Sequence, residues 1–234
     1  MKIGILQTGR SPDEMRATHG DYDDLFKRLL DRRGFTFETY PVLDGVLPAC
    51  VNDAEGWLVT GSKFGTYEAH DWIAPLEDFL RRVFAAAVPI VGVCFGHQIL
   101  AQALGGKVEK FAGGWQVGAT DYVRADGTQD TIMAWHQDQV VEVPDGAVVI
   151  GRSDHCANAM LAYGDKALTL QPHPEFTSAF LSDLLDARRS VLPEHISREA
   201  ERRLDASLSS PDYAQQFEDF FKRKSRAGNP AHQN

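Results

Sequence analysis

The sequence has few cysteines, no long hydrophobic run and a shortage of positive charge. Its 234 residues include three cysteines, Cys50, Cys94 and Cys156, which are odd in number and widely scattered. This set predicts neither a disulfide framework nor zinc-ligand spacing. No apolar stretch is long enough to cross a bilayer, and the apolar run around Gly4 is too short for a signal peptide. We therefore expect a protein of the reducing cytoplasm with no membrane partner.

The charge balance is acidic. The chain has 33 Asp and Glu residues against 24 Lys and Arg residues, which gives a formal net charge of -9. Nucleic acids and acidic membrane surfaces require a basic face, so the balance argues against both as partners. Hydrophobic residues make up 43% of the chain and charged residues 24%, as in ordinary globular proteins. This length and composition favour one large α/β domain with a well-buried core.

The pattern of apolar residues predicts the order of the elements. Strands are expected at residues 3–6, 35–40, 56–59 and 88–93, with the first and the last of them buried. Helices are expected at residues 21–33, 72–83 and 95–104, and a polar loop at 8–20. Short strands separated by glycines follow, at residues 107–111, 115–123, 131–135, 140–143, 147–152, 158–163 and 167–171. We expect this β-rich run to extend the sheet and to build a small antiparallel β layer beside it.

The sequence turns helical after Glu175, with apolar residues again at helical spacing. We assign residues 1–177 to the main domain and residues 178–234 to a C-terminal helical extension of the same domain. The last residues, 227–234, are expected to form a frayed tail.

The stretch from Val88 to Gly106 carries the strongest functional signal. A buried strand ends at Val93 and a helix follows at once, so Cys94 lies in the sharp turn between them. The small residues Gly92 and Gly96 relieve crowding in that turn, which is the logic of a nucleophile elbow. The positive end of the helix dipole favours a thiolate, and the next backbone N–H faces an oxyanion formed by attack from the sulfur. Taken alone, Cys94 is as well explained as an inert buried side chain.

A partner base is available in the segment Gln171 to Glu175. Residues two apart in an extended segment share a face, so His173 and Glu175 point the same way while the prolines beside them fix the backbone. His173 would take the proton from Cys94 and return it to the leaving amine, and Glu175 would orient the imidazole. His136, which follows a predicted strand, stays open as a second candidate base.

The other histidines suit structural positions. We expect His97, in the elbow helix, to be a packing or hydrogen-bonding residue. The remaining five are expected at the surface: His19, His70, His155, His195 and His232.

Two separated motifs, GVCFGHQILAQALGG and QPHPEF, together resemble the class I glutamine amidotransferase family. The resemblance covers residues 2–176 and implies a flavodoxin-like α/β fold, with a mostly parallel central sheet and helices on both faces. It implies a Cys-His-Glu triad in which Cys94 is the nucleophile, His173 the base and Glu175 its partner. Free-standing GMP-synthetase-like amidotransferases, a group that includes γ-glutamyl peptidases, are the most similar members.

The same resemblance implies the rest of the site. The backbone N–H groups of Ser62 and Phe95 match the oxyanion hole, and Gly61 gives its loop freedom. Gln98 matches the residue that contacts glutamine. The segment Trp135-His136 occupies the place of the one that holds the amino-acid end of the substrate. The bulky Trp135 and the Gln137 that follows His136 depart from the family pattern and leave the shape of the pocket open.

Three functions follow as hypotheses. The first is hydrolysis of glutamine through a γ-glutamyl thioester, with ammonia passed to a separate synthase subunit. The second is a stand-alone hydrolase of γ-glutamyl peptides or amides. The third is a non-catalytic redox or stress protein with an elbow cysteine, which has no need of the oriented base His173. No metal or cofactor is implied, because a thiolate, an imidazole and two backbone amides suffice for acyl transfer.

Overall fold

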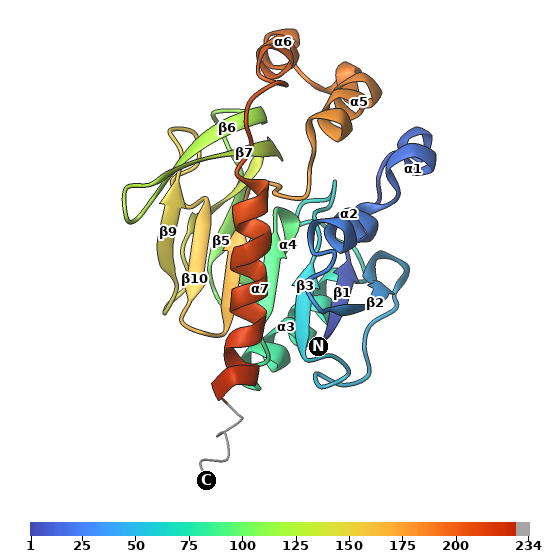
Figure 1. Ribbon diagram of the computed structural model, residues 1–234, viewed down its shortest axis with the longest axis vertical. Coiled ribbons are helices and arrows are strands. Elements are labelled where there is room, and N and C mark those ends of the chain that lie inside the picture. Colours follow the sequence, from blue (N-terminus) through green and yellow to red (C-terminus); the bar gives the residue numbers. More distant parts are fainter. Residues whose placement is uncertain (228–234) are drawn as a thin grey trace.

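A nine-stranded sheet with the order β2-β1-β3-β4-β11-β10-β9-β6-β7 lies at the centre of the computed structural model, which describes residues 1–227 (Figure 1). Five neighbouring strands are parallel: β2 (Thr36–Pro41), β1 (Lys2–Gln7), β3 (Gly56–Val59), β4 (Ile90–Val93) and β11 (Ala167–Leu170). The other four are antiparallel: β10 (Met160–Tyr163), β9 (Val148–Arg152), β6 (Gln116–Arg124) and β7 (Gln129–His136). The predicted extension of a parallel sheet is confirmed.

The predicted small antiparallel layer is also present. It consists of β5 (Lys107–Lys110) and β8 (Asp138–Glu142), which pair only with each other. β8 begins two residues after the end of β7. The chain therefore leaves the main sheet just after Trp135 and His136, the last residues of β7, which were expected near the site.

Helices cover both faces of the parallel half of the sheet. α3 (Ile73–Ala85) and α4 (Phe95–Ala103) pack on one face, while α2 (Tyr22–Leu29) and α7 (Ser210–Ala227) pack on the other. Figure 1 shows α7 running along this second face beside α2. Side chains alternate accordingly in β1, where Ile3 and Ile5 join the cluster under α2 and α7 and Leu6 joins the opposite one. Both faces of β1, β3, β4 and β11 are buried, which explains why these strands are largely apolar. The edge strand β2 differs, because Thr36 and Glu38 on it are exposed.

The predicted loop at residues 8–20 is partly wrong, because α1 (Asp13–His19) forms within it. Asp13 and Glu14 lie in its first turn, where acidic side chains suit the positive end of the helix dipole. Met15 is its only buried residue, so the segment has no apolar stripe from which a helix could be predicted.

The remaining helices lie above one end of the sheet (Figure 1). α5 (Ser178–Arg188) and α6 (Glu194–Arg202) follow one another, joined by a 3₁₀ turn at Arg189–Val191, and a second such turn lies at Val42–Asp44. Their apolar residues form a third core cluster with α1, β6 and β7. The C-terminal extension is therefore packed against the main domain. Residues 228–234, which include most of the expected frayed tail and His232, lie outside the described residues.

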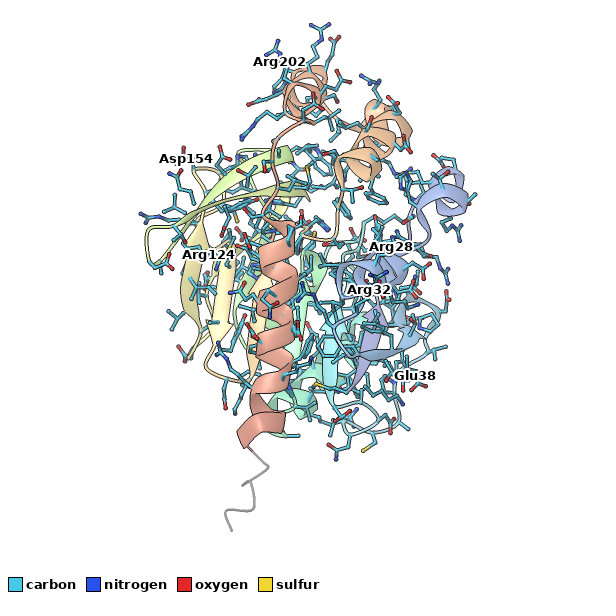
Figure 2. All side chains as sticks on the ribbon, in the orientation of Figure 1. Arg28, Arg32, Glu38, Arg124, Asp154 and Arg202 are labelled. Atoms are coloured by element: carbon cyan, nitrogen blue, oxygen red, sulfur yellow. The ribbon has the colours of Figure 1, made fainter. Side chains whose placement is uncertain are left out.

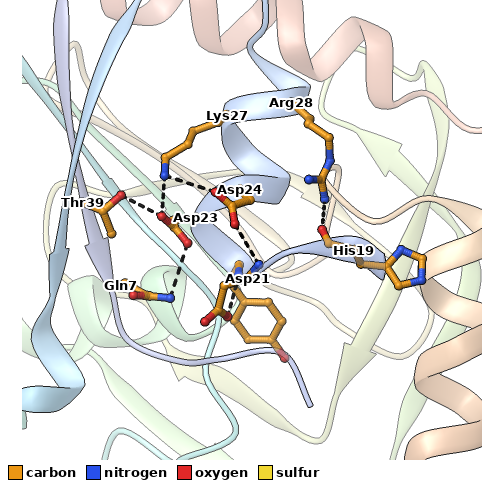
Figure 3. A network of polar contacts seen from close by, with 9 residues as sticks. Gln7, His19, Asp21, Asp23, Asp24, Lys27, Arg28 and Thr39 are labelled. Carbon is orange, nitrogen blue, oxygen red and sulfur yellow. Dashed lines mark hydrogen bonds and ion pairs between the residues drawn. The ribbon is translucent and has the colours of Figure 1, made fainter. Parts of the chain in front are cut away.

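A polar network fixes the start of α2 (Figure 3). Asp21 accepts a hydrogen bond from the Tyr22 N–H and forms a capping box with Asp24. The buried Asp23 carboxylate accepts from Lys27 at 2.6 Å and from Thr39, on β2, at 2.8 Å. These bonds hold the first turn of α2 against the sheet and thereby fix the position of the Tyr22 ring, whose centroid lies 6.3 Å from that of Phe176.

α7 is held to the sheet by a second polar cluster. The hydroxyl of Tyr213, a fully buried side chain, donates to Asp130 Oδ2 at 2.7 Å. Arg124 forms an ion pair with the same carboxylate and lies over the Tyr213 ring, 4.8 Å from its centroid (Figure 2). The cluster joins α7 to both β6 and β7.

None of the helices in residues 1–227 has the length and hydropathy required of a bilayer-spanning helix.

Replacing Tyr213 by Phe tests this cluster. We expect Tyr213→Phe to lower the free energy of unfolding by about 1–3 kcal/mol, because it removes a buried hydrogen bond to a charged acceptor. Tyr40→Phe, at a partly exposed tyrosine of β2, is the matched control and should change stability by less than about 0.5 kcal/mol. Urea unfolding of both variants measures the difference. Equal effects would contradict a stabilising role for the buried cluster.

Candidate active site

The site lies where three adjacent parallel strands end. In the sheet, β4 pairs with β3 through Gly92 and Val59, and with β11 through Val93 and Leu170. The residues that follow β3, β4 and β11 therefore meet at one edge. Ligands of open α/β sheets bind beyond such carboxyl ends. Here the edge brings together the loops that carry Gly61, Cys94 and His173.

Cys94 occupies a strained turn between β4 and α4. Its backbone dihedrals are φ 52° and ψ -104°, a combination that a residue with a side chain rarely adopts. Its backbone N–H donates to the Leu170 carbonyl at 2.8 Å, which ties the turn to β11. A Cβ at Gly92 would meet the Gly96 carbonyl oxygen, and one at Gly96 would meet that of Val59. The turn therefore has no room for a side chain at either glycine, and its assignment as a nucleophile elbow stays a prediction.

His173 and Glu175 form a buried pair behind Cys94. Nδ1 of His173 lies 2.7 Å from Oε1 of Glu175, and the two residues are 4% and 5% exposed. A Cβ at Gly61 would touch both the imidazole and Cβ of Cys94, so the two side chains lie close together. Because Nδ1 is taken by Glu175, Nε2 is the nitrogen left for the sulfur. The three residues thus lie together at the sheet edge.

The backbone and the ring of His173 are both fixed. Its N–H donates to the Met133 carbonyl of β7 at 2.7 Å, through an isolated antiparallel bridge. Its ring stacks on Phe176 with centroids 4.0 Å apart. Pro172 lies two residues after the end of β11 and has no N–H group to donate to a neighbouring strand. Regular strand pairing therefore ends here, as expected for a strand end bounded by prolines.

His173 and the other buried histidines of the site differ in their electrostatic surroundings and therefore in their pKa values. Burial alone would lower the pKa of His173, but the Glu175 carboxylate and the Cys94 thiolate raise it to about 10. Burial lowers the pKa of both His97 and His136 to about 3, and neither has a carboxylate beside it to offset that effect. The surroundings therefore favour the charged form of His173 and the neutral forms of His97 and His136.

His97 and His136 have different roles in the structure. His97 is fully buried and its Nδ1 lies 2.8 Å from the Thr169 hydroxyl, so the predicted hydrogen-bonding position is confirmed. His136 lines a cavity, and its ring lies 6.4 Å from that of His155. Of the histidines expected at the surface, only His195 is exposed among those described; His19, His70 and His155 are half-buried.

The loop after β3 is held in one orientation by two buried hydroxyls. The hydroxyls of Thr8 and Thr60 lie 3.2 and 3.1 Å from the Gly61 carbonyl oxygen, to which they can donate. Because the peptide is trans and planar, the Ser62 N–H points away from these hydroxyls. A Cβ at Gly61 would lie 2.9 Å from Cε1 of His173, so the loop approaches the imidazole more closely than a side chain would allow.

The Phe95 N–H is the second donor at this edge. Phe95 is the first residue of α4, so its N–H has no acceptor within the helix. Ser62 lines the same cavity as Cys94, and Phe95 is the residue after Cys94, so both backbone N–H groups belong to this edge of the sheet. This arrangement is suited to stabilising a negative oxygen close to the sulfur.

A cavity of about 410 Å³ opens beside the sulfur. Five residues singled out from the sequence line it: Ser62, Cys94, Gln98, Trp135 and His136. The Trp135 carbonyl lies 3.9 Å from Sγ of Cys94. The amide nitrogen of Gln98 donates to the Asp138 carbonyl at 2.8 Å and to Oε1 of Gln171 at 3.1 Å, so this side chain is fixed at the cavity wall.

Within residues 1–227 no group of three His, Cys, Asp or Glu side chains is placed to hold a metal ion.

Sequence reasoning missed three contributors to the site. Thr8 follows β1 at the same sheet edge, and its position after a buried strand could have identified it. Tyr22 and Arg188 come from helices, and no local signal marks them. Their roles depend on where α2 and α5 lie, which the sequence pattern does not specify.

Comparisons with known proteins give a consistent picture. Residues 26–183 match the model of the family described as glutamine amidotransferase class-I. γ-Glutamyl peptidase 4 of Arabidopsis thaliana is 27% identical over 229 residues, covering 89% of this chain and 90% of that protein. A glutamine-hydrolysing GMP synthase subunit of Methanopyrus kandleri is 32% identical over 172 residues, covering 67% of this chain and 85% of that protein. A glutamine amidotransferase structure from Methylobacillus flagellatus superimposes with a TM-score of 0.77 at 21% identity, covering 100% of this chain and 99% of that one.

The charge on His173 gives a testable pH dependence. The pKa of His173 is raised from its ordinary value of 6.5 to about 10, so its contribution to stability is complete below pH 6.5 and is lost as the pH rises to about 10. Histidine NMR should show His173 protonated at pH 8, with His97 and His136 neutral. Glu175→Gln should lower the pKa of His173 by about 1–3 units.

Asp183→Asn is the matched control, because Asp183 is an exposed carboxylate that pairs with His19. It should leave the His173 resonances where they are. A His173 that titrates near 6.5 in the unmodified protein would refute the proposed charge.

Proposed function

The chain belongs to the class I glutamine amidotransferase family, and from that premise we propose that it hydrolyses γ-glutamyl amide bonds through a thioester on Cys94. The observation that carries the proposal is Cys94 on the wall of a cavity, close to the hydrogen-bonded pair His173 and Glu175. A buried imidazole fixed by a carboxylate and placed beside a sulfur is the arrangement of a nucleophile with its base.

Acylation is the first step. The Cys94 thiolate attacks the γ-carbonyl carbon, an S–C bond forms, and the carbonyl π electrons move onto oxygen. When the tetrahedral intermediate collapses, the C–N bond breaks and the leaving nitrogen takes the proton from Nε2 of His173. The products of this step are a γ-glutamyl thioester, a free amine or ammonia, and a neutral imidazole.

Deacylation reverses the roles. A water molecule gives a proton to the neutral His173 as its oxygen attacks the thioester carbon. The S–C bond then breaks, glutamate leaves, and the sulfur departs as a thiolate beside the newly charged imidazole. Glu175 keeps the ring oriented and stabilises its charged form in both steps.

The oxyanion of both intermediates would lie between the N–H groups of Ser62 and Phe95. The donors are held before substrate arrives, one by the start of α4 and one by the Thr8 and Thr60 hydroxyls on the Gly61 carbonyl. Donors that need no reorganisation during reaction stabilise a transition state most effectively. Gln98, Trp135 and His136 line the cavity and are proposed to hold the glutamyl group.

Two leaving groups are compatible with this chemistry. Release of ammonia to a separate synthase subunit would make the chain a glutaminase, and release of an amino acid would make it a γ-glutamyl peptidase. A redox role for Cys94 is less well supported, because such a thiol does not require His173 and Glu175 to be ordered behind it.

Covalent trapping tests the nucleophile. A glutamine-derived chloroketone should alkylate the protein once, and peptide mass spectrometry should place the adduct on Cys94. Cys94→Ala should abolish both labelling and turnover, while Cys50→Ser, at an exposed cysteine, should retain both.

We expect His173→Ala to reduce kcat by about 10²–10⁴-fold, the usual range for general acid–base catalysis. Glu175→Gln should reduce it less, and rates in the opposite order would contradict the assigned roles.

The oxyanion loop has its own test. Thr60→Val keeps the shape of the side chain but removes the hydroxyl that contacts the Gly61 carbonyl. Loss of an oxyanion donor lowers kcat by about 10²–10³-fold, so a partly misoriented one should lower it about 10-fold with little change in KM. Thr128→Val, which removes an exposed hydroxyl bonded to Asp126, should have no effect on kcat. A change confined to KM would show that Thr60 acts on substrate binding instead.

A further inference from the structure

The cavity beside Cys94 contains more cations than carboxylates. Lys63, Lys110 and Arg188 all line it, and none of the ion pairs among the described side chains includes them. The charge of Lys110 nevertheless acts to lower the pKa of the Glu68 and Asp138 carboxyls, and Lys63 lies over the Phe64 ring, 5.1 Å from its centroid. Of the two acidic residues that line the same cavity, Glu68 accepts from the Gly65 N–H at 3.1 Å and pairs with His70. Asp138 accepts from the Tyr67 hydroxyl at 3.0 Å. The cavity therefore has unused positive charge.

Arg188 is the most constrained of these cations. It is half-buried, it is the last residue of α5, and that helix packs through Phe180, Leu181 and Leu184. Removing a guanidinium from water without giving it a carboxylate is costly, and its planar set of donors matches a carboxylate. The adjacent Arg189 differs, because it is exposed and pairs with Asp186 and Glu201. An anion that enters the cavity would complete the surroundings of Arg188.

The position of Arg188 places that anion on the side of the leaving group. The leaving nitrogen takes its proton from His173, so the released group lies on the His173 side of the sulfur. The His173 ring stacks on the Phe176 ring, with centroids 4.0 Å apart, and the centroid of the Tyr22 ring lies 6.3 Å from that of Phe176. α5, which carries Arg188, begins two residues after Phe176, and Arg188 and Cys94 line the same cavity. Gln98 lines another part of the wall, where it is bonded to Asp138.

The charges on possible substrates then distinguish them. Free glutamine has one carboxylate and one ammonium group, so its net charge is zero. A γ-glutamyl amino acid has a second carboxylate, on the residue that is released. The cavity, at about 410 Å³, is within the range of about 300–1,000 Å³ that is usual for ligands larger than a single amino acid. Arg188, for which no ion pair is found among the described residues, suits the second carboxylate.

We infer that Arg188 binds the carboxylate of the amino acid that is released, so that γ-glutamyl peptides with a free C-terminal carboxylate are the preferred substrates. This inference rests on the proposed function and adds the leaving group to it. The glutamyl half of the substrate occupies the wall formed by Gln98 and Trp135, and its own carboxylate is left for Lys63 or Lys110. The partly exposed rings of Phe64 and Tyr67 offer apolar surface to the side chain of the released residue.

The experiment compares three substrates that share the γ-glutamyl group: γ-glutamyl-alanine, its C-terminal carboxamide, and glutamine. For the unmodified protein we expect kcat/KM to be about 10–100-fold higher for the acid than for the carboxamide, as for one charged hydrogen-bonded pair. Arg188→Met should bring the acid-to-carboxamide ratio to about 1. Arg188→Lys should restore part of it, because the charge returns without the planar donors.

Arg189→Met is the matched control and should keep the ratio of the unmodified protein. Thermal unfolding of each variant shows whether it is folded, and Arg188→Lys supplies a second variant if Arg188→Met is not. An equal rate for acid and carboxamide in the unmodified protein would overturn the inference, as would a ratio that Arg188→Met leaves unchanged. In either case turnover of the carboxamide or of glutamine would leave the proposed function standing. Failure to hydrolyse any of the three would overturn the proposed function itself.

Discussion

A charged imidazole buried beside a sulfur is the interaction on which the arrangement of this protein depends. Burial opposes charge on His173, and only the adjacent Glu175 and Cys94 make the charged form stable. Such a balance requires fixed distances. The bridge from His173 to Met133 and the stack on Phe176 hold the imidazole from two directions, while β4 and β11 run side by side to bring the sulfur to it. The segment after β11 is thus tied to β7, a strand of the antiparallel half.

The strained turn at Cys94 has the same origin. A positive φ at a residue with a side chain costs about 1–3 kcal/mol and persists only where the surroundings leave no alternative. Here the bond to the Leu170 carbonyl and the close approach of Gly96 to Val59 remove the alternatives. The strain raises the sulfur above the sheet edge, in reach of both His173 and the two backbone donors. Stability lost in the turn is offset by the packing of β4 and α4, whose residues are almost all buried.

The sequence made the site easier to predict than its surroundings. The elbow at Cys94 and the segment of His173 and Glu175 are local patterns, so their chemistry could be read before their contact was known. The parallel strands β1, β3 and β4 were equally clear because they are buried on both faces. α1 was missed since Met15 alone anchors it. The guanidinium of Arg188 could not be placed in the site because its position results from the packing of distant elements.

Chemistry and specificity are linked through the short connection that follows Glu175. Phe176 stacks on His173, Thr177 caps α5 by accepting the Phe180 N–H at 3.1 Å, and α5 carries Arg188 at its other end. The helix is anchored by four buried side chains, Phe180, Leu181, Leu184 and Leu185. It is therefore held at a fixed position relative to His173. A change in the length or packing of α5 would move the cation relative to the imidazole while leaving the sulfur in place. The C-terminal extension can therefore alter which leaving group is accepted without disturbing the bond-breaking groups, since these groups belong to β4 and to the segment after β11.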